Sequence, residues 1–201
     1  MKNRRLCALL FVLATGFAAW SYFGLDRKLL EPCRQIKQLS KPFWEAVTQA
    51  GLAGPWVITA ALCWLFFRYR QNPNPVVANR AAFFFVAVAA AGVANTLIKV
   101  CCGRARPSMW TREGVYGFHG FSVDSHYGSF PSGHSNTAAA VALALAILFP
   151  RYRWLFLVFA LLVATSRVIL GAHYLSDVIV GLCTGVAGVL VVARFWKFRS
   201  E

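Results

Sequence analysis

His173 and Asp177 have the residue types and the spacing of an acid–base pair. They are four residues apart, so a helix that contained both would carry them on one face. The carboxylate could then accept the proton of one imidazole nitrogen and leave the other nitrogen free to attack an electrophile. His134, which ends a Pro-Ser-Gly-His run, supplies a second imidazole.

Ser132 and Gly133 precede that second histidine and indicate an anion-binding helix start. Serine is a preferred N-cap residue. The first amides of the helix, near Gly133 and His134, would point at an anion with the helix dipole behind them. An ordinary helix cap beside an incidental histidine is the alternative interpretation.

Three basic residues could hold the oxygens of such an anion. Arg167 stands inside an apolar stretch, where an ionisable group is costly and therefore indicates function, unless it snorkels to the interface. Lys99 and Arg106 flank a short basic segment that, taken alone, would be the solvated end of a helix. The planar fork of arginine suits phosphate because it binds two oxygens at once.

Together these clusters form an inventory for phosphoryl transfer. The equatorial phosphate oxygens need positive charge, a nucleophile must attack in line, and the leaving alkoxide needs a proton. The chain has only seven Asp and Glu residues, and they are scattered, so we expect no metal and no other cofactor.

The composition indicates a membrane protein. Of the 201 residues, 58% are hydrophobic, and the mean hydropathy is +0.55, beyond ordinary soluble usage. The net charge is +14, but most basic residues lie in short segments between apolar runs. This distribution suits anionic headgroups and a phosphorylated ligand, and it argues against nucleic acid as a partner.

Six apolar stretches have about the length that crosses a bilayer. They must form helices, because backbone groups in lipid need hydrogen-bond partners within their own segment. We therefore predict an all-α fold in which residues 1–201 form a single transmembrane domain, an integral membrane bundle of six helices. The predicted spans are 6–25, 52–67, 81–98, 131–149, 154–170 and 178–193.

Two features near the amino terminus complete the expected architecture. The first apolar run could be a signal peptide cut near Ala18 and Ala19, but its length favours an uncleaved anchor. Residues 27–49 have the pattern of an amphipathic helix on the outer membrane surface. The side chains expected to face lipid are Leu29, Leu30, Ile36, Phe43 and Trp44.

The basic segments set the expected orientation. Those at residues 2–5, 68–80, 151–153 and 194–199 fall on one side of a six-span bundle, and that side is expected to be the cytoplasm. Both termini would be cytoplasmic. The three chemical clusters would lie on the opposite, extracytoplasmic face.

The six cysteines show neither C-x-x-C spacing nor histidine companions at zinc-site intervals. Most are expected to be small, buried apolar side chains. A disulfide from Cys33 to Cys101 or Cys102 is an alternative that the sequence leaves open.

At these residues the chain resembles the type-2 phosphatidic acid phosphatase family, in the superfamily shared with vanadium haloperoxidases. The three signatures of the family are Lys-x6-Arg-Pro, Pro-Ser-Gly-His and Ser-Arg-x5-His-x3-Asp. All three are intact between Lys99 and Asp177, and jointly they are highly specific. The first two spans match the family only in being apolar.

The resemblance implies a metal-independent lipid phosphatase that forms a phosphohistidine. His173 would be the nucleophile, Asp177 would orient it, and His134 would protonate the leaving oxygen. The phosphate oxygens would be held by Lys99, Arg106, Arg167, Ser132 and the Gly133 amide.

Other functions are alternatives with weaker support. A vanadate-dependent haloperoxidase has no need of six membrane spans. A transporter would line a permeation path with charges, whereas these charges gather at one face. A catalytically dead lipid-binding relative would be expected to lack a motif residue.

The sequence does not select the lipid. Candidates are phosphatidic acid, phosphatidylglycerophosphate, undecaprenyl pyrophosphate and the lipid A phosphates, so a monoester and a diphosphate both stay open, as does the oligomeric state. The compact chain resembles bacterial members, which implies the cell membrane. The loop 108–130 is expected to roof the pocket and help select the headgroup, with a solvated surface loop as the alternative.

Overall fold

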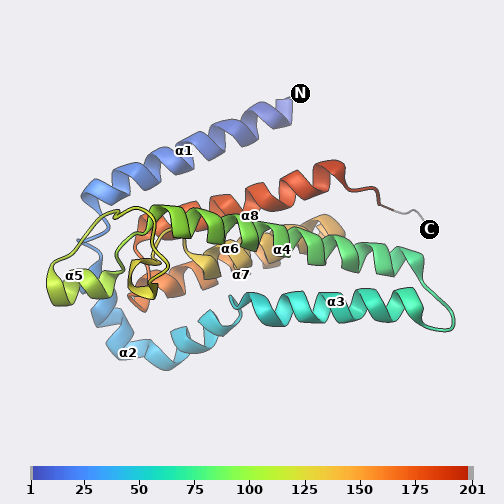
Figure 1. Ribbon diagram of the computed structural model, residues 1–201, viewed down its shortest axis with the longest axis horizontal. Coiled ribbons are helices and arrows are strands. Elements are labelled where there is room, and N and C mark those ends of the chain that lie inside the picture. The colour runs from blue at the N-terminus through green and yellow to red at the C-terminus, as the bar shows by residue number, and fades with distance from the viewer. Residues whose placement is uncertain (1, 199–201) are drawn as a thin grey trace.

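The computed structural model describes residues 2–198 and is built from helices (Figure 1). Within that range no β-strand occurs; isolated bridges join Arg104 to Phe118 and to Gly128. The predicted all-α class is confirmed. The helices are α1 (Lys2–Gly24), α2 (Leu30–Gln49), α3 (Ala53–Tyr69), α4 (Pro75–Cys102), α5 (Pro107–Glu113), the 3-10 turn η1 (Ser125–Tyr127), α6 (Gly133–Leu148), the 3-10 turn η2 (Pro150–Tyr152), α7 (Arg153–Ile169) and α8 (Leu175–Phe195).

Four helical stretches are long and apolar enough to cross a membrane, and the chain is accordingly a multi-pass membrane protein. The first runs through α2 and α3. Two further apolar helices, within α1 and α6, are shorter than this length, so the count of six spans stays a prediction. The four long stretches are Leu30–Tyr69, Pro75–Cys102, Pro150–Ile169 and Leu175–Phe195.

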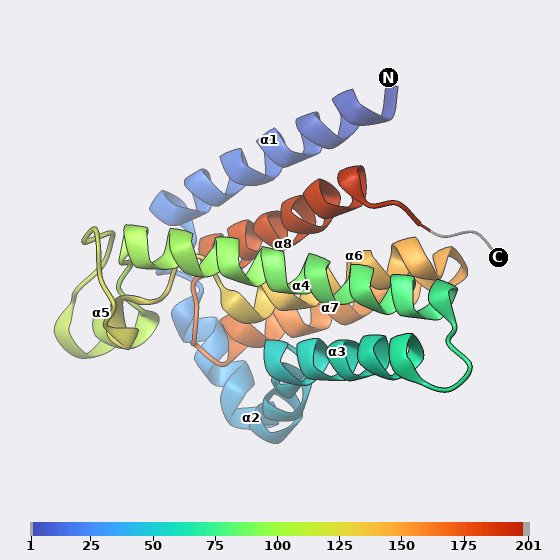
Figure 2. The same cartoon turned by 45° about the vertical axis from the view of Figure 1, so that its right-hand side comes forward.

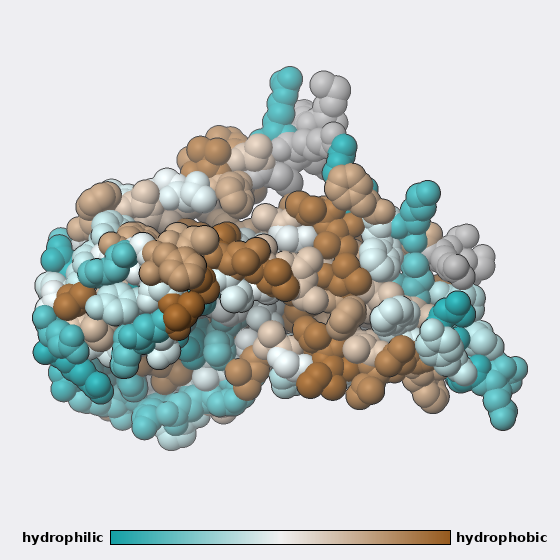
Figure 3. All heavy atoms as spheres, in the orientation of Figure 1, coloured by the Kyte–Doolittle hydropathy of each residue, from teal (hydrophilic) through white to brown (hydrophobic). Residues whose placement is uncertain are grey.

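The surface agrees with a lipid environment. Large apolar side chains point outward along the bundle, and Leu62, Leu97 and Leu155 are each more than 60% exposed. Figure 3 shows hydrophobic residues along the length of the bundle and hydrophilic residues gathered over the end formed by α5. Contiguous apolar surface of this kind would be a liability in water and is expected in a bilayer.

α8 is central to the bundle and packs against α6, α4 and α1 (Figure 2). Its buried stripe includes Asp177, Gly181, Gly185 and Val189, which recur at helical spacing. A Cβ at Gly181 would lie 2.5 Å from the Ser132 carbonyl oxygen. The glycines therefore allow α6 to approach the backbone of α8 closely, as small residues do between membrane helices.

The buried face of α6 also consists of small residues. Ala138, Ala140 and Ala144 are fully buried. The polar contacts between these helices are neutral: Asn136 donates to the Thr184 hydroxyl at 3.1 Å, and Thr184 donates to the Asn95 side-chain oxygen at 3.1 Å. Such hydrogen bonds join α4, α6 and α8 without placing charge in the apolar part of the bundle.

The two ends of the bundle differ. α4 and α7 end, and α6 and α8 begin, at the end that α2 and α5 cover (Figure 1). α1 begins and α8 ends towards the opposite end of the bundle, the end that also carries the turn between α3 and α4. This topology gathers the three motif segments at one end, because each lies where a helix starts or stops there.

A helix does occupy the segment predicted to be amphipathic, and it is kinked. Ser40 has a non-helical backbone (φ −138°, ψ 22°), two residues before Pro42. α2 packs on α7: Lys37 Nζ donates to the Leu170 carbonyl at 3.0 Å, and Thr48 accepts a bond from Arg167 at 2.7 Å. The position of α2 on a membrane surface stays a prediction.

The cysteines differ from expectation. The five that the structure describes are free, which includes all three considered for a disulfide. None of the five is buried, so the prediction of buried thiols is wrong for them; Cys7 lies outside the described side chains. The physical reason is that lipid, rather than protein, is the apolar surrounding available on the outside of these helices. The five are Cys33, Cys63, Cys101, Cys102 and Cys183.

The close approach of α8 to α6 yields a stability prediction. In Gly185→Ala the new methyl would collide with the Asn136 carbonyl and lie 3.0 Å from the Ala139 Cβ. We expect this variant to lose about 1–3 kcal/mol, the usual cost of overpacking. Gly92→Ala, with nothing within 4 Å of its new methyl, is the control and should be neutral or stabilising. Thermal unfolding in detergent measures both, and equal effects would contradict this packing.

Candidate active site

The structure brings six motif residues together at the α5 end of the bundle. Lys99 lies at the end of α4, Arg106 in the turn before α5 and His134 in the first turn of α6. Arg167 lies in the last turn of α7, His173 in the α7–α8 turn and Asp177 in the first turn of α8. They lie close enough to act on one another's charge. His134, for example, interacts electrostatically with Lys99, Arg106, Arg167 and His173.

His173 is 97% buried and has a defined orientation. Its Nδ1 lies 2.7 Å from the backbone carbonyl oxygen of Ser129, so Nδ1 carries the proton and donates it there. The ring's other nitrogen, Nε2, is then the unprotonated one. Burial lowers the pKa of His173 to about 4, against the opposing effect of the Asp177 charge, so the ring is neutral at pH 7.

Asp177 does not accept the imidazole proton, in contrast to the expectation from the spacing. Its Oδ2 is 3.8 Å from His173 Nδ1, beyond a hydrogen bond. The helix that was expected to contain both residues begins only at Leu175, so it contains Asp177 but not His173. Asp177 instead accepts bonds from the Ser129 hydroxyl at 2.6 Å and from the Tyr174 amide at 2.9 Å. It therefore fixes His173 indirectly. Ser129, which Asp177 holds, is the acceptor of the His173 hydrogen bond, and Tyr174, which Asp177 also holds, is the next residue along the chain.

Arg104 is the third partner of Asp177, and sequence reasoning missed it. Its guanidinium is fully buried and forms ion pairs with Asp177 and with Asp26, the latter at 2.7 Å. It also donates to the Ser176 hydroxyl at 2.7 Å, and the Tyr174 ring lies 4.6 Å from its central carbon. Arg104 thus joins the end of α1, the loop after α4 and the start of α8.

A signal for this network was available in the sequence. Asp26 is one of only seven acidic residues and directly follows the first apolar run. An ionisable residue at a membrane boundary requires a partner. The partner could not be named, because Arg104 is 78 residues away along the chain and reads as a spacer inside the first motif.

Lys99 and Arg106 are held by backbone carbonyls of one loop. Lys99 Nζ donates to the carbonyls of Gly128 and Pro131, each at 2.7 Å. Arg106 Nε donates to the carbonyl of Ser125 at 2.8 Å. Both cations keep further N–H groups for a ligand, since an ammonium has three donors and a guanidinium has five.

The start of α6 confirms the predicted cap. Ser132 is the N-cap residue, and its hydroxyl accepts a bond from the Ser135 amide. Gly133 follows, and nothing lies within 4 Å of where a Cβ would stand, so the space beside its Cα is open. His134 comes next, and Gly51 in the α2–α3 turn lies against it: a Cβ on Gly51 would be 3.0 Å from the His134 ring.

Arg167 is anchored at one nitrogen and unpaired at another. Its Nη1 donates to Thr48, whereas its Nε is buried with no hydrogen-bond partner among the described residues. An orphaned buried donor is costly, and an incoming anion would satisfy it. The cluster as a whole has the same demand. The charge of Asp177 acts on Lys99 and Arg106, and the positive charges of Lys99, Arg106 and Arg167 repel one another. A bound phosphate would relieve that repulsion.

The buried pairing of Arg104 can be tested by stability. Arg104→Leu leaves Asp26 and Asp177 buried without their cation, so we expect a loss of about 3–5 kcal/mol. Arg70→Leu removes an exposed arginine at the opposite end and should change stability by less than about 0.5 kcal/mol. Thermal unfolding of both variants in detergent measures the difference. A loss below about 1 kcal/mol in Arg104→Leu would contradict the network.

Comparison with known proteins identifies a family and several relatives. Residues 80–201, more than half of the chain, match the PAP2 superfamily. The lipid A 1-phosphatase of Rhizobium johnstonii is 45% identical over 112 residues, which are 56% of this chain and 46% of that protein. The lipid A 4′-phosphatase of Porphyromonas gingivalis is 29% identical over 160 residues, 73% of this chain and 63% of that protein. The chain thus spans about half the length of the first of these relatives.

A solved structure shares the fold along the whole chain. It is the crystal structure of the first transmembrane PAP2 type phosphatidylglycerolphosphate phosphatase from Bacillus subtilis. The TM-score is 0.67 at 21% identity, with 99% of this chain and 100% of that one covered. Intact motifs, their convergence at one end of the bundle and the match over residues 80–201 lead to one conclusion: the chain belongs to the PAP2 superfamily.

Proposed function

We propose that this chain is a membrane lipid phosphatase that hydrolyses a phosphate monoester through a phosphohistidine on His173. The observation that carries the proposal is the orientation of that ring. His173 Nδ1–H donates a hydrogen bond to the Ser129 carbonyl at 2.7 Å, so Nε2 keeps its lone pair for an in-line attack on phosphorus. A low pKa keeps the ring neutral and ready at pH 7.

The half-buried cations fit the binding of the phosphate group. Arg167 offers an unsatisfied buried Nε, and Lys99 and Arg106 each retain donors beyond those used on the loop. The Gly133 amide and the capped start of α6 add a dipole aimed at an anion. Three permanent cations can neutralise the equatorial oxygens of the transition state, so the mechanism has no step that needs a metal.

His134 is proposed to protonate the leaving oxygen. It lies in the first turn of α6, close to the three cations. A general acid must be protonated before the reaction, whereas the nucleophile must be neutral. In the first step the P–O bond to the lipid breaks as the bond from Nε2 to phosphorus forms, and His134 gives its proton to the lipid alkoxide. In the second step His134 takes a proton from water, which attacks phosphorus and releases inorganic phosphate and neutral His173.

The relatives suggest the class of lipid. Two of them are named for the 1- and the 4′-phosphates of lipid A, which are monoesters on a glycolipid. We therefore propose lipid A phosphate as the substrate ahead of phosphatidic acid, phosphatidylglycerophosphate and undecaprenyl pyrophosphate. The site end of the bundle is proposed to face away from the cytoplasm, because the basic turns of the chain lie at the opposite end.

A panel of radiolabelled lipids tests chemistry and substrate together. The purified chain in neutral detergent is offered lipid A labelled at the 1- or 4′-phosphate, phosphatidic acid, phosphatidylglycerophosphate and undecaprenyl pyrophosphate. We expect the fastest phosphate release from lipid A. His173→Ala should lower kcat/KM by more than about 10³-fold, because the nucleophile is gone.

The matched control is His119→Ala, the same substitution at an exposed histidine of the loop. It should release phosphate at the wild-type rate. Wild type quenched in alkaline detergent, where a P–N bond survives, should retain label on protein, and His173→Ala should not. Equal rates in His173→Ala and wild type would refute the phosphohistidine.

The two histidines also predict a bell-shaped pH profile. His173 must be neutral to attack, and its low pKa places the acidic limb of kcat/KM near pH 4, with activity rising as the pH rises through that value. His134 must be protonated in the enzyme–substrate complex, where the bound phosphate offsets the three cations around it, so kcat should fall again as the pH rises above the pKa that His134 has in that complex. His134→Gln should abolish the alkaline limb and keep the acidic one. A monotonic profile between pH 4 and 10 would contradict this assignment.

A further inference from the structure

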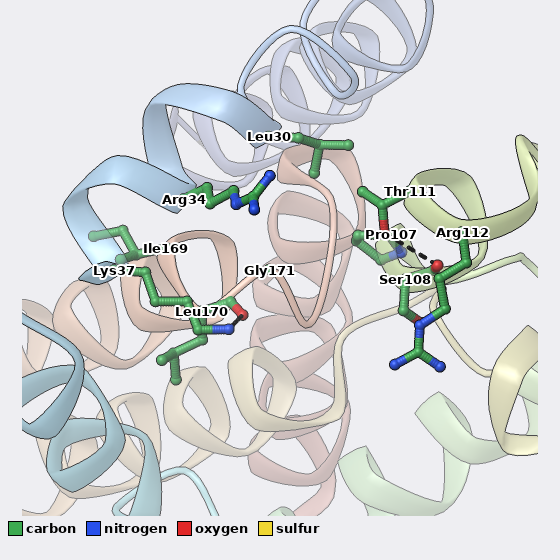
Figure 4. A pocket seen from close by; sticks show the side chains of 10 residues that line it. All are labelled: Leu30, Arg34, Lys37, Pro107, Ser108, Thr111, Arg112, Ile169, Leu170 and Gly171. Carbon is green, nitrogen blue, oxygen red and sulfur yellow. Dashed lines mark hydrogen bonds between the residues drawn. The ribbon is translucent and has the colours of Figure 1, made fainter.

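A second cavity lies beside the phosphate site, between α2, α5 and the α7–α8 turn (Figure 4). Its volume is about 440 Å³. We call it the basic cavity and define it by Arg34, Lys37, Ser108, Arg112, Leu170 and Gly171. In Figure 4, Arg34 and Lys37 from α2 lie on one side, and Ser108 and Arg112 from α5 lie on the other.

The charge of the basic cavity is of one sign. Three of its lining residues are basic and none is acidic. Arg34 has an acidic neighbour in Glu31, at 3.9 Å, but both side chains are about 70% exposed, so that pair is weak. Hydroxyl-bearing Ser108 adds a polar group. Such a lining attracts an anion and provides charge-assisted donors for its oxygens.

Lys37 is fixed in position rather than left in solvent. It is half-buried, and its Nζ donates to the Leu170 carbonyl at 3.0 Å. That bond uses one of its three N–H groups and holds the ammonium at the cavity wall. The wall is therefore arranged before any ligand arrives, which lowers the entropy cost of binding.

The basic cavity is separate from the phosphate site and close to it. None of Lys99, Arg106, His134, Arg167 or His173 lines it. Its wall nevertheless continues into that site, since Gly171 is two residues from His173 along the chain. Two residues span at most about 7 Å. On the other side, Pro107 lines the cavity and directly follows Arg106.

We propose that the basic cavity binds a second lipid-borne phosphate while the first phosphate lies at His173. This rests on the proposed function and extends it, because it assigns a site to an anionic group that is not hydrolysed. A lipid headgroup of moderate size can reach both the basic cavity and the phosphate site, since both adjoin the α7–α8 turn. The phosphate can belong to the substrate itself or to a neighbouring anionic lipid, and both offer the same chemistry.

Paired substrates test the proposal. The full chain in neutral detergent is given lipid A with both the 1- and 4′-phosphates, or with the scissile phosphate alone. We expect wild type to prefer the doubly phosphorylated lipid. Arg34→Gln with Arg112→Gln should reduce the ratio of the two kcat/KM values by about tenfold or more, mainly through KM, because two charge-assisted contacts are lost.

The matched control is Lys41→Gln, which removes one positive charge from the same helix at an exposed position outside the cavity. It should leave the ratio at the wild-type value. If Lys41→Gln lowers the ratio as much as the double variant, bulk charge is responsible and the basic cavity is not a site. An unchanged ratio in the double variant also overturns the proposal, unless added phosphatidylglycerol raises kcat/KM in the next experiment.

The second arm distinguishes the source of the phosphate. Phosphatidylglycerol or phosphatidylcholine is added to micelles that hold the singly phosphorylated lipid. If a neighbouring lipid occupies the cavity, phosphatidylglycerol alone should raise kcat/KM, and only in chains that keep Arg34 and Arg112. No response in this arm and no change of ratio in the first arm would together exclude a second phosphate.

Binding separates this inference from the proposed function. His173→Ala is mixed with each radiolabelled lipid, and bound label is measured at equilibrium. A preference for the doubly phosphorylated lipid that disappears with Arg34→Gln and Arg112→Gln supports the cavity even if wild type hydrolyses neither lipid. Hydrolysis that depends on His173, with equal binding of the two lipids and no response to phosphatidylglycerol, supports the phosphatase and refutes the cavity.

Discussion

The buried guanidinium of Arg104 is the constraint on which the site depends. A fully buried cation is tolerated only when it is paired, and Asp26 and Asp177 provide the pairing. Three segments that are distant in sequence must therefore meet at one point. Once Asp177 is fixed there, it fixes Ser129 through its hydroxyl, and the Ser129 carbonyl in turn fixes His173. The His173 ring is thus positioned at the end of a chain of contacts that begins at an ion pair.

The rest of the bundle follows the opposite rule. Between α4, α6 and α8 the polar contacts are neutral, through Asn95, Asn136 and Thr184, and the packing relies on glycine and alanine. Buried charge is concentrated at one end, where α2 and α5 cover the helix termini. Costly ion pairing and orphaned donors are found there, as is common at functional sites.

Much of this could be predicted from sequence because it depends on local properties. Apolar length located the helices, and the serine before Gly133 located the start of α6. The contact between His173 and its acceptor could not be predicted, because spacing does not reveal where a helix begins. Tyr174 caps α8, so the helix starts after His173 and the pairing with Asp177 is lost. The ion pair between Arg104 and Asp26 could not be predicted, because the two residues are far apart in sequence and no periodic pattern links them.

The acceptors that hold the site residues have one feature in common. Lys99, Arg106 and His173 donate to main-chain carbonyls of residues 125–131. Apart from Ser129, whose hydroxyl is held by Asp177, the acceptor residues use no side-chain atom for these bonds. The path of the loop, more than its composition, is therefore what natural selection must preserve. Side chains along this loop can diverge to suit new headgroups while the reaction chemistry stays constant, which makes the segment a natural place for relatives to acquire different substrates.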